Sequence, residues 1–511
     1  MTRLAGAAAL AASLTVTAAC GGTNTAGTGA ATSKTLTMAL QGQILNFDPW
    51  GSPNGLNGSV WSMGAVYDSL THVASDGTVQ PWLATSWTQA DSTHLTLQLR
   101  DDVKFSDGTA FDGSVVKANL DYAQSVEQPG ECNAYVKGVT TAVDSATQVT
   151  LTLATPNPDI LTDLGTCAGF MVSPTALGDA TTLKTTPSGS GPYTLATEGT
   201  VQGQTWTFTR NASYWAKDTY KYDKLVMKFF SDTTAAANAA KSGQVDVIQS
   251  VDAKTDTSGQ TLLLSNPQEF RGFFFDDVTG DVNKALGDVR VRQALNYALD
   301  RDTLVKAVFG DTAVANYSSS PFVDGITGFT SALNSYYSYD PAKAKQLLAD
   351  AGYASGLTIK VLNYPGLSGQ LAQAVAGQLR EVGVNLDISD HGNDFLTQLA
   401  TGDWPIVTGN YTLSTAQYHN LQGMITANGF FNARKNTNAD FDKLLDQIAA
   451  TTDAAQQKTL YEQLATTIAE QAWFLVPAVV KSATAYNDKK VTMAATKGSA
   501  VPFLYNIQPA S

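Results

Sequence analysis

The stretch PWLATSWTQADSTHLTLQLRDDVKFSDGTAFDGSVVKANL, residues 81–120, contains three secondary-structure signals in a row. Its leucines at positions 95–99 alternate with polar residues, which predicts a half-buried strand. An Asp-Gly pair at 107–108 is typical of a hairpin turn, because glycine accommodates a positive φ. A helix is expected to follow, with Asp112 or Ser114 as its N-cap. Each of these signals has a plain structural explanation.

A second group of signals, at residues 339–388, predicts parallel β-structure. YDPAKAKQLLADAGY (339–353) has an aspartate N-cap, a proline at the first helical position and a glycine stop. Apolar residues alternate along 357–362, repeat with helical spacing along 370–383 and alternate again along 384–388. This order predicts a strand–helix–strand unit, with parallel strands and a right-handed crossover.

These stretches resemble family 5 of the extracellular solute-binding proteins, the dipeptide- and oligopeptide-binding type of ABC importers. The segments that carry the resemblance follow one another in the family's order and cover about residues 36–480. Besides the two stretches above, they are SGSGPYTL (188–195), RNASYW (210–215), KSGQVDVI (241–248) and DVRVRQALNYALDRDTLV (288–305).

The resemblance implies an α/β fold of the two-lobed, periplasmic-binding-protein-like class with an extra subdomain, whose lobes are joined by two crossing strands. We expect the crossings near EFRGFFFDD (269–277) and WFLVPAVV (473–480), because both are apolar and aromatic enough to be buried strands. The expected divisions are a signal peptide (1–19), a tether (20–35), lobe I (36–270) with the inserted subdomain (about 76–187), lobe II (271–476) and a return to lobe I (477–511).

The N-terminal segment MTRLAGAAALAASLTVTAAC has the order of a secretory signal peptide: an early Arg3, an apolar stretch and small residues before Cys20. The sequence TAAC resembles a bacterial lipobox, which predicts that Cys20 is lipidated and that the chain is cut before it. Thr17 stands where a lipobox usually has leucine, and an ordinary cleaved signal with an accidental cysteine is the alternative. Residues 21–35 are rich in Gly, Thr, Ala, Ser and Asn, as in a flexible tether.

The composition argues against several classes of function. A net charge of −13 does not suit nucleic acid, whose phosphates attract a basic face. After residue 20 no apolar run is long enough to span a bilayer. We find no motif for a catalytic nucleophile, a zinc site or a phosphate loop. No histidine has metal-ligand spacing from another histidine or a cysteine. We therefore expect no enzyme, no cofactor and no metal site.

The cysteines predict a disulfide. If Cys20 carries lipid, Cys132 and Cys167 remain as an even pair, and such a pair is readily bridged outside the cytoplasm. Closing a loop of about 36 residues would stabilise the fold by roughly 3–4 kcal/mol. The alternative is a pair of unbridged, buried thiols.

Ligands of α/β lobes bind beyond the carboxyl ends of parallel strands. In lobe II this rule favours the loops NYPG (363–366) and GNYT (409–412), each of which follows an apolar strand. In lobe I the resemblance favours the loop after the first strand, and the glycine turn at 188–195 is a further candidate. Structural roles compete with these assignments, such as core packing for a tryptophan. The candidate ligand-binding residues are Asn46, Phe47, Trp61, Ser190, Asn363, Tyr364, Asn410 and Tyr411.

One position departs from the peptide-binding pattern. Peptide binders of this family typically read Gly-Trp-x-x-Asp, and the aspartate pairs with the α-amino group of the peptide. In this chain Asn410 stands at the tryptophan position and Leu413 at the aspartate position. A buried ammonium needs a carboxylate partner. Either another acid, such as Asp48 or Asp324, replaces it, or the ligand is not a peptide with a free N-terminus.

The expected function is that of a lipid-anchored, monomeric substrate-binding subunit of an ABC importer on the outer face of the cell membrane. It would close two lobes around a peptide, a peptide-like compound or a neutral polar solute, and deliver it to the permease and ATPase subunits. A non-peptide ligand, such as a sugar or metabolite, is one alternative. A sensor or chaperone-like binding lipoprotein without a transporter is the other.

Overall fold

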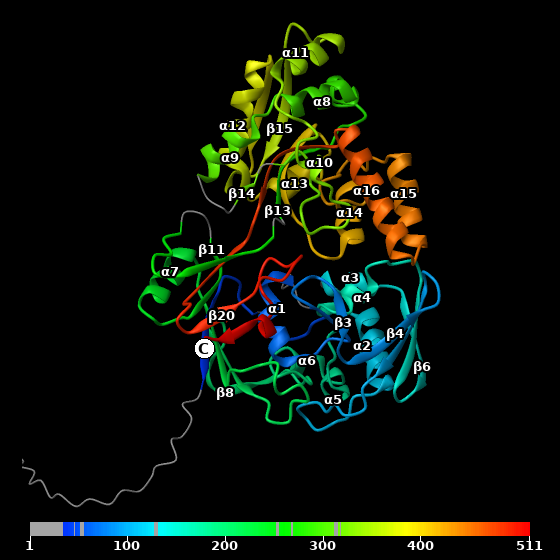
Figure 1. The fold of residues 1–511 in the computed structure, drawn as a ribbon, viewed down its shortest axis with the longest axis vertical. Helices are drawn as coiled ribbons and strands as arrows, with labels where there is room; N and C mark the ends of the chain where they lie inside the picture. The colour runs from blue at the N-terminus through cyan, green and yellow to red at the C-terminus, as the bar shows by residue number, and fades with distance from the viewer. Residues whose placement is uncertain are drawn as a thin grey trace, which may run out of the picture. The chain divides into compact units, whose positions relative to one another are not determined.

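The computed structural model describes residues 34–510, except 45, 52–55, 127–130, 252–254, 267–268, 311–314 and 317. The predicted signal peptide, Cys20 and almost all of the predicted tether lie outside the described residues. Lys34–Ser511 form one compact unit, in which the described strands build three larger sheets (Figure 1). In this described part, no helix is long and apolar enough to cross a membrane.

The first sheet has seven strands, with the N-terminal strand β1 in its middle. In β1 the apolar residues Leu36, Met38 and Leu40 are buried, as their alternation predicts. β1 pairs in parallel with β10 and with β11. The order is β12 (Thr261–Leu264), β19 (Ala483–Tyr486), β11 (Val247–Val251), β1 (Thr35–Leu40), β10 (Lys224–Phe229), β9 (Thr205–Arg210) and β8 (Tyr193–Val201).

The second sheet has six strands and contains the predicted strand–helix–strand unit. β15 and β16 are parallel, and β15 is also parallel to β17. The long helix α12 (Pro365–Glu381) connects β15 to β16, as predicted. The order is β14 (Ala315–Asn316), β18 (Phe474–Val480), β13 (Glu269–Phe275), β17 (Ile406–Thr412), β15 (Leu357–Asn363) and β16 (Val384–Asp390).

The chain passes from the first sheet to the second after β12 and returns between β18 and β19. The two segments predicted as crossings, β13 and β18, are indeed buried strands, but they are antiparallel neighbours inside the second sheet. We call the part built around the second sheet, residues 269–480, lobe II, and the rest of the described chain lobe I. The two-lobed α/β fold class expected from the sequence is thus confirmed.

Lobe I carries an additional four-stranded antiparallel sheet within the predicted inserted subdomain. It contains the opening sequence stretch, with Asp112 as the N-cap of α2 (Gly113–Ser125). A disulfide joins Cys132 to Cys167, with their Cα atoms 5.5 Å apart, so the predicted bridge is present. The order is β4 (Ala84–Gln89), β5 (His94–Leu99), β7 (Gln148–Leu153) and β6 (Val139–Ser145).

Helices surround the sheets, and many begin at a side-chain cap. Asp340 accepts a hydrogen bond from the backbone of Lys343 and so starts α11, as predicted. The other helices of lobe I are α1 (Leu56–Val66), α3 (Glu131–Tyr135), α4 (Ile160–Asp163), α5 (Pro174–Leu177), α6 (Ala180–Leu183) and α7 (Thr233–Lys241). Lobe II adds α8 (Val289–Tyr297), α9 (Arg301–Phe309), α10 (Ser331–Asn334), α11 (Pro341–Asp350), α13 (Phe395–Leu399), α14 (Gln417–Ile425), α15 (Ala439–Ala450) and α16 (Ala454–Glu470).

Two buried arginines fasten α8 and α9 to the rest of lobe II. Arg292 donates to the backbone carbonyls of Leu286, Gln471 and Ala472. Arg301 donates to several acceptors, among them the carbonyl of Val476 in β18. Their hydrogen bonds satisfy main-chain oxygens that would otherwise be buried without a partner. This gives a structural explanation for two of the three arginines in the DVRVRQALNYALDRDTLV segment.

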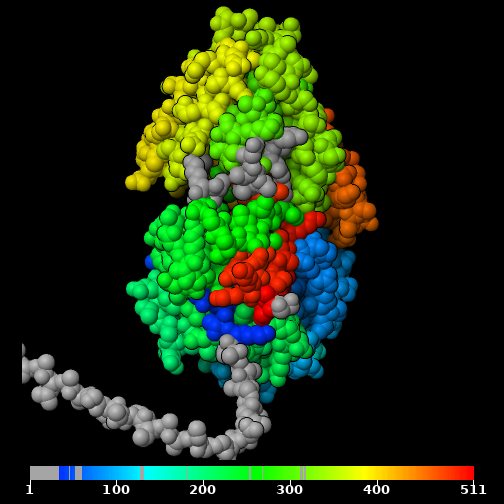
Figure 2. Space-filling model, turned by 60° about the vertical axis from the view of Figure 1, so that its left-hand side comes forward, coloured from blue at the N-terminus to red at the C-terminus, as the bar shows by residue number. Residues whose placement is uncertain are grey.

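The C-terminal segment returns to lobe I. Figure 2 shows it in red against the blue N-terminal part and the green residues that follow β8. Beyond β19, a two-stranded sheet forms from β20 (Val491–Met493) and β21 (Ile507–Pro509). Another small sheet, β2 (Thr71–Val73) with β3 (Val79–Pro81), lies earlier in lobe I. Tyr505 donates a hydrogen bond to the carbonyl of Val73, so the C-terminal segment is fastened to β2.

Candidate ligand-binding site

A cavity of about 910 Å³ is lined by residues of both lobes. Lobe I contributes three parts of its wall, from residues 60–82, 134–170 and 497–505, together with Tyr220. Lobe II contributes the end of β17 and the start of α14, between Tyr411 and Gln422. A volume of this size lies in the range of small-molecule sites, and apolar lining with a few polar groups is typical of them.

A pair of buried carboxylates, Asp159 and Asp163, stands at the point where the lobes touch. Asp163 is the last residue of α4 and Asp159 precedes that helix, so both lie on lobe I. His419, on α14 of lobe II, donates from its backbone N–H to Asp159, over 3.0 Å. Its ring nitrogen Nε2 lies 2.9 Å from Oδ2 of Asp163. The same oxygen of Asp163 accepts from the side-chain amide of Asn157, over 2.8 Å.

Burial controls the protonation of this group. Burial, followed by the charge of Asp163, raises the pKa of Asp159 to about 7. Burial also raises the pKa of Asp163, against the opposing effect of His419. Burial alone would lower the pKa of His419, but the hydrogen bond to Asp163 and the two carboxylate charges outweigh it, so the pKa is raised. The group therefore holds protons near neutral pH more firmly than isolated side chains would.

Asp68, a second buried carboxylate in the cavity wall, forms no ion pair with any cation among the described residues. It accepts hydrogen bonds from the indoles of Trp82 and Trp215, from the hydroxyl of Tyr214 and from that of Ser190. All four donors are neutral and all belong to lobe I. Burial raises the pKa of Asp68, while the four hydrogen bonds oppose that shift.

An aromatic stack forms another part of the wall. Phe503 stacks on Tyr505 and His72 stacks on Trp82, with ring centroids 5.3 and 4.6 Å apart. Between these pairs, the ring of Tyr505 packs at a tilt on that of His72, with centroids 4.0 Å apart. All four residues line the cavity. Burial lowers the pKa of His72 to about 4, so this imidazole is neutral at physiological pH. The stack therefore offers an uncharged, largely apolar face to a ligand.

None of the four candidate residues of lobe I lines the cavity, and three of them are buried. Phe47 packs edge-on against Trp206 in the core. Trp61 is buried, and its indole donates to the carbonyl of Pro502. Ser190 is buried and holds Asp68, whereas Asn46 is half-buried and accepts from the backbone N–H of Asp48.

The turn around Ser190 has glycines for a steric reason. A Cβ atom on Gly189 would lie 1.9 Å from the carbonyl oxygen of Val66, and a Cβ on Gly191 would lie 2.5 Å from the Val66 carbonyl carbon. The turn therefore packs against the end of α1, and this contact accounts for the glycines of SGSGPYTL without a ligand.

In lobe II only one of the four candidates, Tyr411, lines the cavity. Asn363 is fully buried at the end of β15, where it donates to Asp390 and accepts from Thr408. Tyr364 is exposed outside the lining and packs edge-on against Phe395. Asn410 and Tyr411 are residues of β17 rather than of a loop after it, because β17 continues its pairing with β13 to Thr412.

The departure from the peptide-binding pattern lies in the cavity wall. Leu413 lines the cavity and is buried. Neither Asp48 nor Asp324, the acids considered as replacements, lines it. The carboxylates that do line it are Asp68 and Asp163. The sequence carries one signal for Asp163, which it does not single out as a candidate: Asp163 follows another acid, Asp159, by four residues in an otherwise largely apolar segment.

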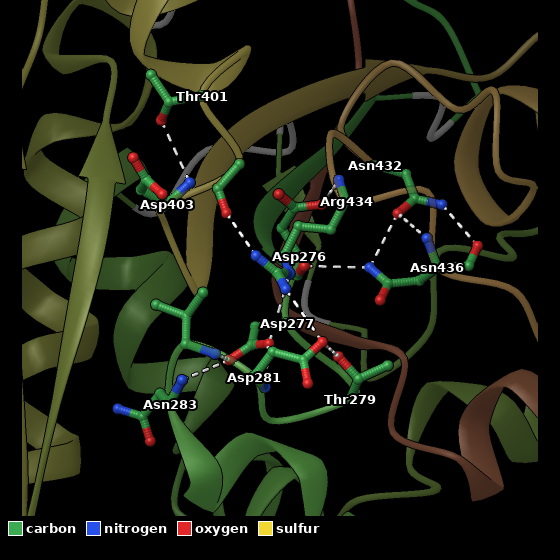
Figure 3. A network of polar contacts seen from close by, with 12 residues as sticks. Asp276, Asp277, Thr279, Asp281, Asn283, Thr401, Asp403, Asn432, Arg434 and Asn436 are labelled. Atoms are coloured by element: carbon green, nitrogen blue, oxygen red, sulfur yellow. Dashed lines mark hydrogen bonds and ion pairs between the residues drawn. The ribbon is translucent and has the colours of Figure 1, made fainter.

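A separate polar network in lobe II does not form part of the cavity (Figure 3). Asp277 is fully buried and accepts hydrogen bonds from three consecutive backbone N–H groups, at residues 281–283. Arg434 reaches across from the loop before α15 to Asp281 and to the carbonyl of Gly402. Burial raises the pKa of the neighbouring Asp276 to about 7. The network fastens loops to the end of β13.

Among the described residues, no cluster of His, Cys, Asp or Glu is suited to hold a metal ion.

The model for the bacterial extracellular solute-binding proteins, family 5, matches residues 78–432. The chain belongs to this family. The glutathione-binding protein GsiB of Pectobacterium atrosepticum is 28% identical over 490 residues, which cover 90% of this chain and 91% of that protein. GsiB of Escherichia coli K12 is 26% identical with the same coverage.

Solved structures of similar fold include other solute-binding proteins. The ABC transporter substrate-binding protein CtaP of Listeria monocytogenes superposes with a TM-score of 0.80 at 21% identity, over 94% of this chain and 100% of CtaP. NikA of Brucella suis superposes with a TM-score of 0.79 at 25% identity, over 93% of this chain and 99% of NikA. The family to which the chain belongs is thus one of extracellular solute-binding proteins.

Proposed function

We propose that the protein captures a small peptide-like solute that carries carboxylate groups, in the cavity between its lobes, and delivers it to an ABC permease. The observation that carries this proposal is the charge of the cavity lining. Both lining carboxylates are already engaged, Asp68 by four neutral donors and Asp163 by His419. A ligand ammonium would therefore have to displace a partner that the protein already supplies.

The lining also contains two lysines, Lys137 and Lys497. No ion pair joins either of them to a carboxylate within the described part of the chain. Cations without such a partner favour ligands with carboxylate groups. The relatives named as glutathione-binding proteins agree with this class, since glutathione is a tripeptide whose two carboxylates outnumber its one ammonium, so that its net charge at neutral pH is negative. The aromatic stack supports the alternative of a carbohydrate, whose apolar ring faces pack on aromatic side chains.

Thermal shift on refolded, ligand-stripped protein tests the ligand class. The panel is glutathione, an unmodified neutral tripeptide, its N-acetylated form, its C-terminally amidated form and a set of sugars. A ligand at a hundredfold excess over its Kd stabilises the protein by about 2.7 kcal/mol, which is easily detected. We expect glutathione and the N-acetylated peptide to raise the melting temperature, and the amidated peptide to have less effect. Stabilisation by sugars alone, or loss of binding on N-acetylation, would contradict the proposal.

The anchoring part of the proposal rests on the sequence TAAC at residues 17–20. Residues 1–19 would be removed, a lipid on Cys20 would hold the protein on the outer face of the cell membrane, and residues 21–35 would be the tether. Changing Cys20 to Ala should release the protein into the medium or leave it unprocessed. A variant that stays on the membrane at wild-type size would argue against lipidation. Adjacent permease and ATPase genes would support import over a sensor role.

A further inference from the structure

The contact between His419 and the acid pair joins the two lobes. His419 belongs to α14 of lobe II, while Asp159 and Asp163 belong to lobe I. In the chain, Asp163 precedes His419 by 256 residues. The side chain of Asp163 is 1% exposed and that of His419 is 21% exposed. Separating the lobes would break both hydrogen bonds and open the acid pair to water.

The acid pair depends on this contact for its cation. Two carboxylates at such close quarters repel each other, and burial increases the repulsion because it removes water. The other groups that face the histidine bring no positive charge. The ring of Tyr135 packs on it at 4.8 Å, the amide oxygen of Gln422 lies 3.4 Å from Nδ1, and the ring of Tyr418 is 6.5 Å away. Behind them, burial, followed by the charge of Asp446, raises the pKa of Tyr418, and burial, followed by the charge of Asp159, raises the pKa of Tyr461.

We propose that His419 and the Asp159–Asp163 pair form a proton-linked clasp, so that closing the lobes around a ligand takes up protons from solution. The clasp refines the solute capture proposed above and rests on it for its physiological meaning. Its existence can nevertheless be tested without any ligand.

The direction of the linkage follows from the surroundings of the three groups. With the lobes apart, the side chains would face water and titrate near their ordinary pKa values, about 6.5 for histidine and about 4 for aspartate. With the lobes together, the pKa of each of the three groups is raised. All three shifts have the same sign, so they add rather than cancel. Closure is therefore favoured as the pH falls through neutrality and opposed as it rises.

The size of the effect is set by the number of protons taken up. Uptake of one proton changes the ratio of closed to open molecules by up to about tenfold per pH unit. We expect a ligand held between the lobes to bind roughly fivefold to tenfold more tightly at pH 6 than at pH 8. The factor is smaller than tenfold per pH unit because proton uptake is not complete over the whole of this pH range. Ligand release would be promoted at the alkaline end.

The first experiment uses the ligand-free mature protein. The ring protons of the four histidines are followed by NMR from pH 5 to 9, and the His419 signal is assigned from its absence in His419→Gln. The control is His94→Gln, since His94 pairs with Asp91 inside one lobe, at the surface. We expect His419 to titrate above 6.5 and to return towards 6.5 in Asp163→Asn. A pKa at or below 6.5 in the wild-type protein would overturn the proposal.

The second experiment measures closure by small-angle X-ray scattering at pH 6 and pH 8. The wild-type protein and His94→Gln should have a larger radius of gyration at pH 8, whereas His419→Gln should show the same radius at both. Equal pH dependence of wild type and His419→Gln would also overturn the clasp. If both experiments support the clasp while none of the peptides and sugars binds at either pH, the proposed ligand class fails and the clasp stands.

Discussion

Asp68 and the Asp159–Asp163 pair are buried carboxylates beside the same cavity, but they are stabilised in different ways. Asp68 is satisfied by four neutral donors that all belong to its own lobe. The acid pair receives two hydrogen bonds from a residue of the other lobe, and its only contacting cation within the described structure is an imidazole. The first arrangement is independent of how the lobes move, whereas the second exists only while they touch. Whether a buried carboxylate keeps its hydrogen bonds when the lobes separate therefore depends on which lobe supplies the donors, and not on burial itself.

Removing the carboxylate of Asp68 should have the largest effect. Asp68→Ala would leave four donors without an acceptor, namely two buried hydroxyls and two half-buried indole N–H groups, and each buried one costs about 1–3 kcal/mol. Allowing for partial rearrangement, we expect a loss of at least about 3 kcal/mol in the free energy of unfolding, measured by urea denaturation. Asp68→Asn keeps an acceptor oxygen and is the matched control, with a smaller loss. An alanine variant as stable as the wild type would show that water replaces the carboxylate.

Breaking the disulfide should have the next largest effect. The bridge from Cys132 to Cys167 spans 35 residues and connects α3 to the segment after α4, on either side of the acid pair. In the chain-entropy model such a loop contributes about 3–4 kcal/mol. The double variant Cys132→Ala/Cys167→Ala should unfold at lower urea concentration, and reducing agent should shift the wild type but not the variant. Insensitivity of the wild type to reduction would contradict the prediction.

The pH dependence of stability should separate the two acid sites. His419 has a raised pKa, so its contribution to stability is complete below about 6.5 and is lost as the pH rises through the folded value. Asp159 has a pKa raised to about 7, so its contribution to stability falls as the pH rises from about 4 and is gone once the folded group has ionised, above about 7. Both effects lower stability between pH 6 and pH 8, by about 1–2 kcal/mol together.

Calorimetry at these two pH values measures this difference. Asp159→Asn and His419→Gln should each flatten the pH profile relative to the wild type. Variants with an unchanged slope would show that other groups cause the pH dependence.

Asp276 should give the smallest effect, although it is as buried as Asp68. Its oxygen Oδ2 has no hydrogen-bond partner in the described structure, and burial raises its pKa to about 7. Asp276→Asn removes a charge that is unfavourable above that pH, so we expect a change within about 1 kcal/mol, tending to stabilise at pH 8. Asp277→Asn is the comparison, because it weakens the acceptor of three backbone N–H groups. Equal effects of the two variants in urea denaturation would contradict this assignment.

Local signals predicted the fold well where they dominate. The alternation in β15 and β16 and the cap of α11 were read directly from the sequence and are present. The sequence predicts a cleft loop at NYPG, but its proline occupies the first turn of α12, a position that suits proline because its N–H is missing. Asn363 therefore lies at the buried end of a strand and not in a loop.

The site was harder to predict because its residues meet only through tertiary structure. His419 and Asp163 are far apart in the chain, and no local spacing connects them. Trp61 and Phe47 are aromatic residues in the part of lobe I where the site was expected, yet both are buried in its core. Of the eight candidate residues, only Tyr411 combines a position near the end of a strand with a place in the cavity wall.

The central position of β1 has a consequence for the order in which the lobes fold. Thr35 pairs with Lys224, and Tyr486 near the other end of the chain pairs with Val247 in the same sheet. The described strands of the six-stranded sheet all come from residues 269–480. As the chain emerges, β1 waits for β10 and β11, which still precede the strands of lobe II, but lobe I is complete only when β19 follows the last of those strands. Contacts so distant in sequence form slowly, so lobe I is the lobe that remains longest exposed to misfolding and proteolysis.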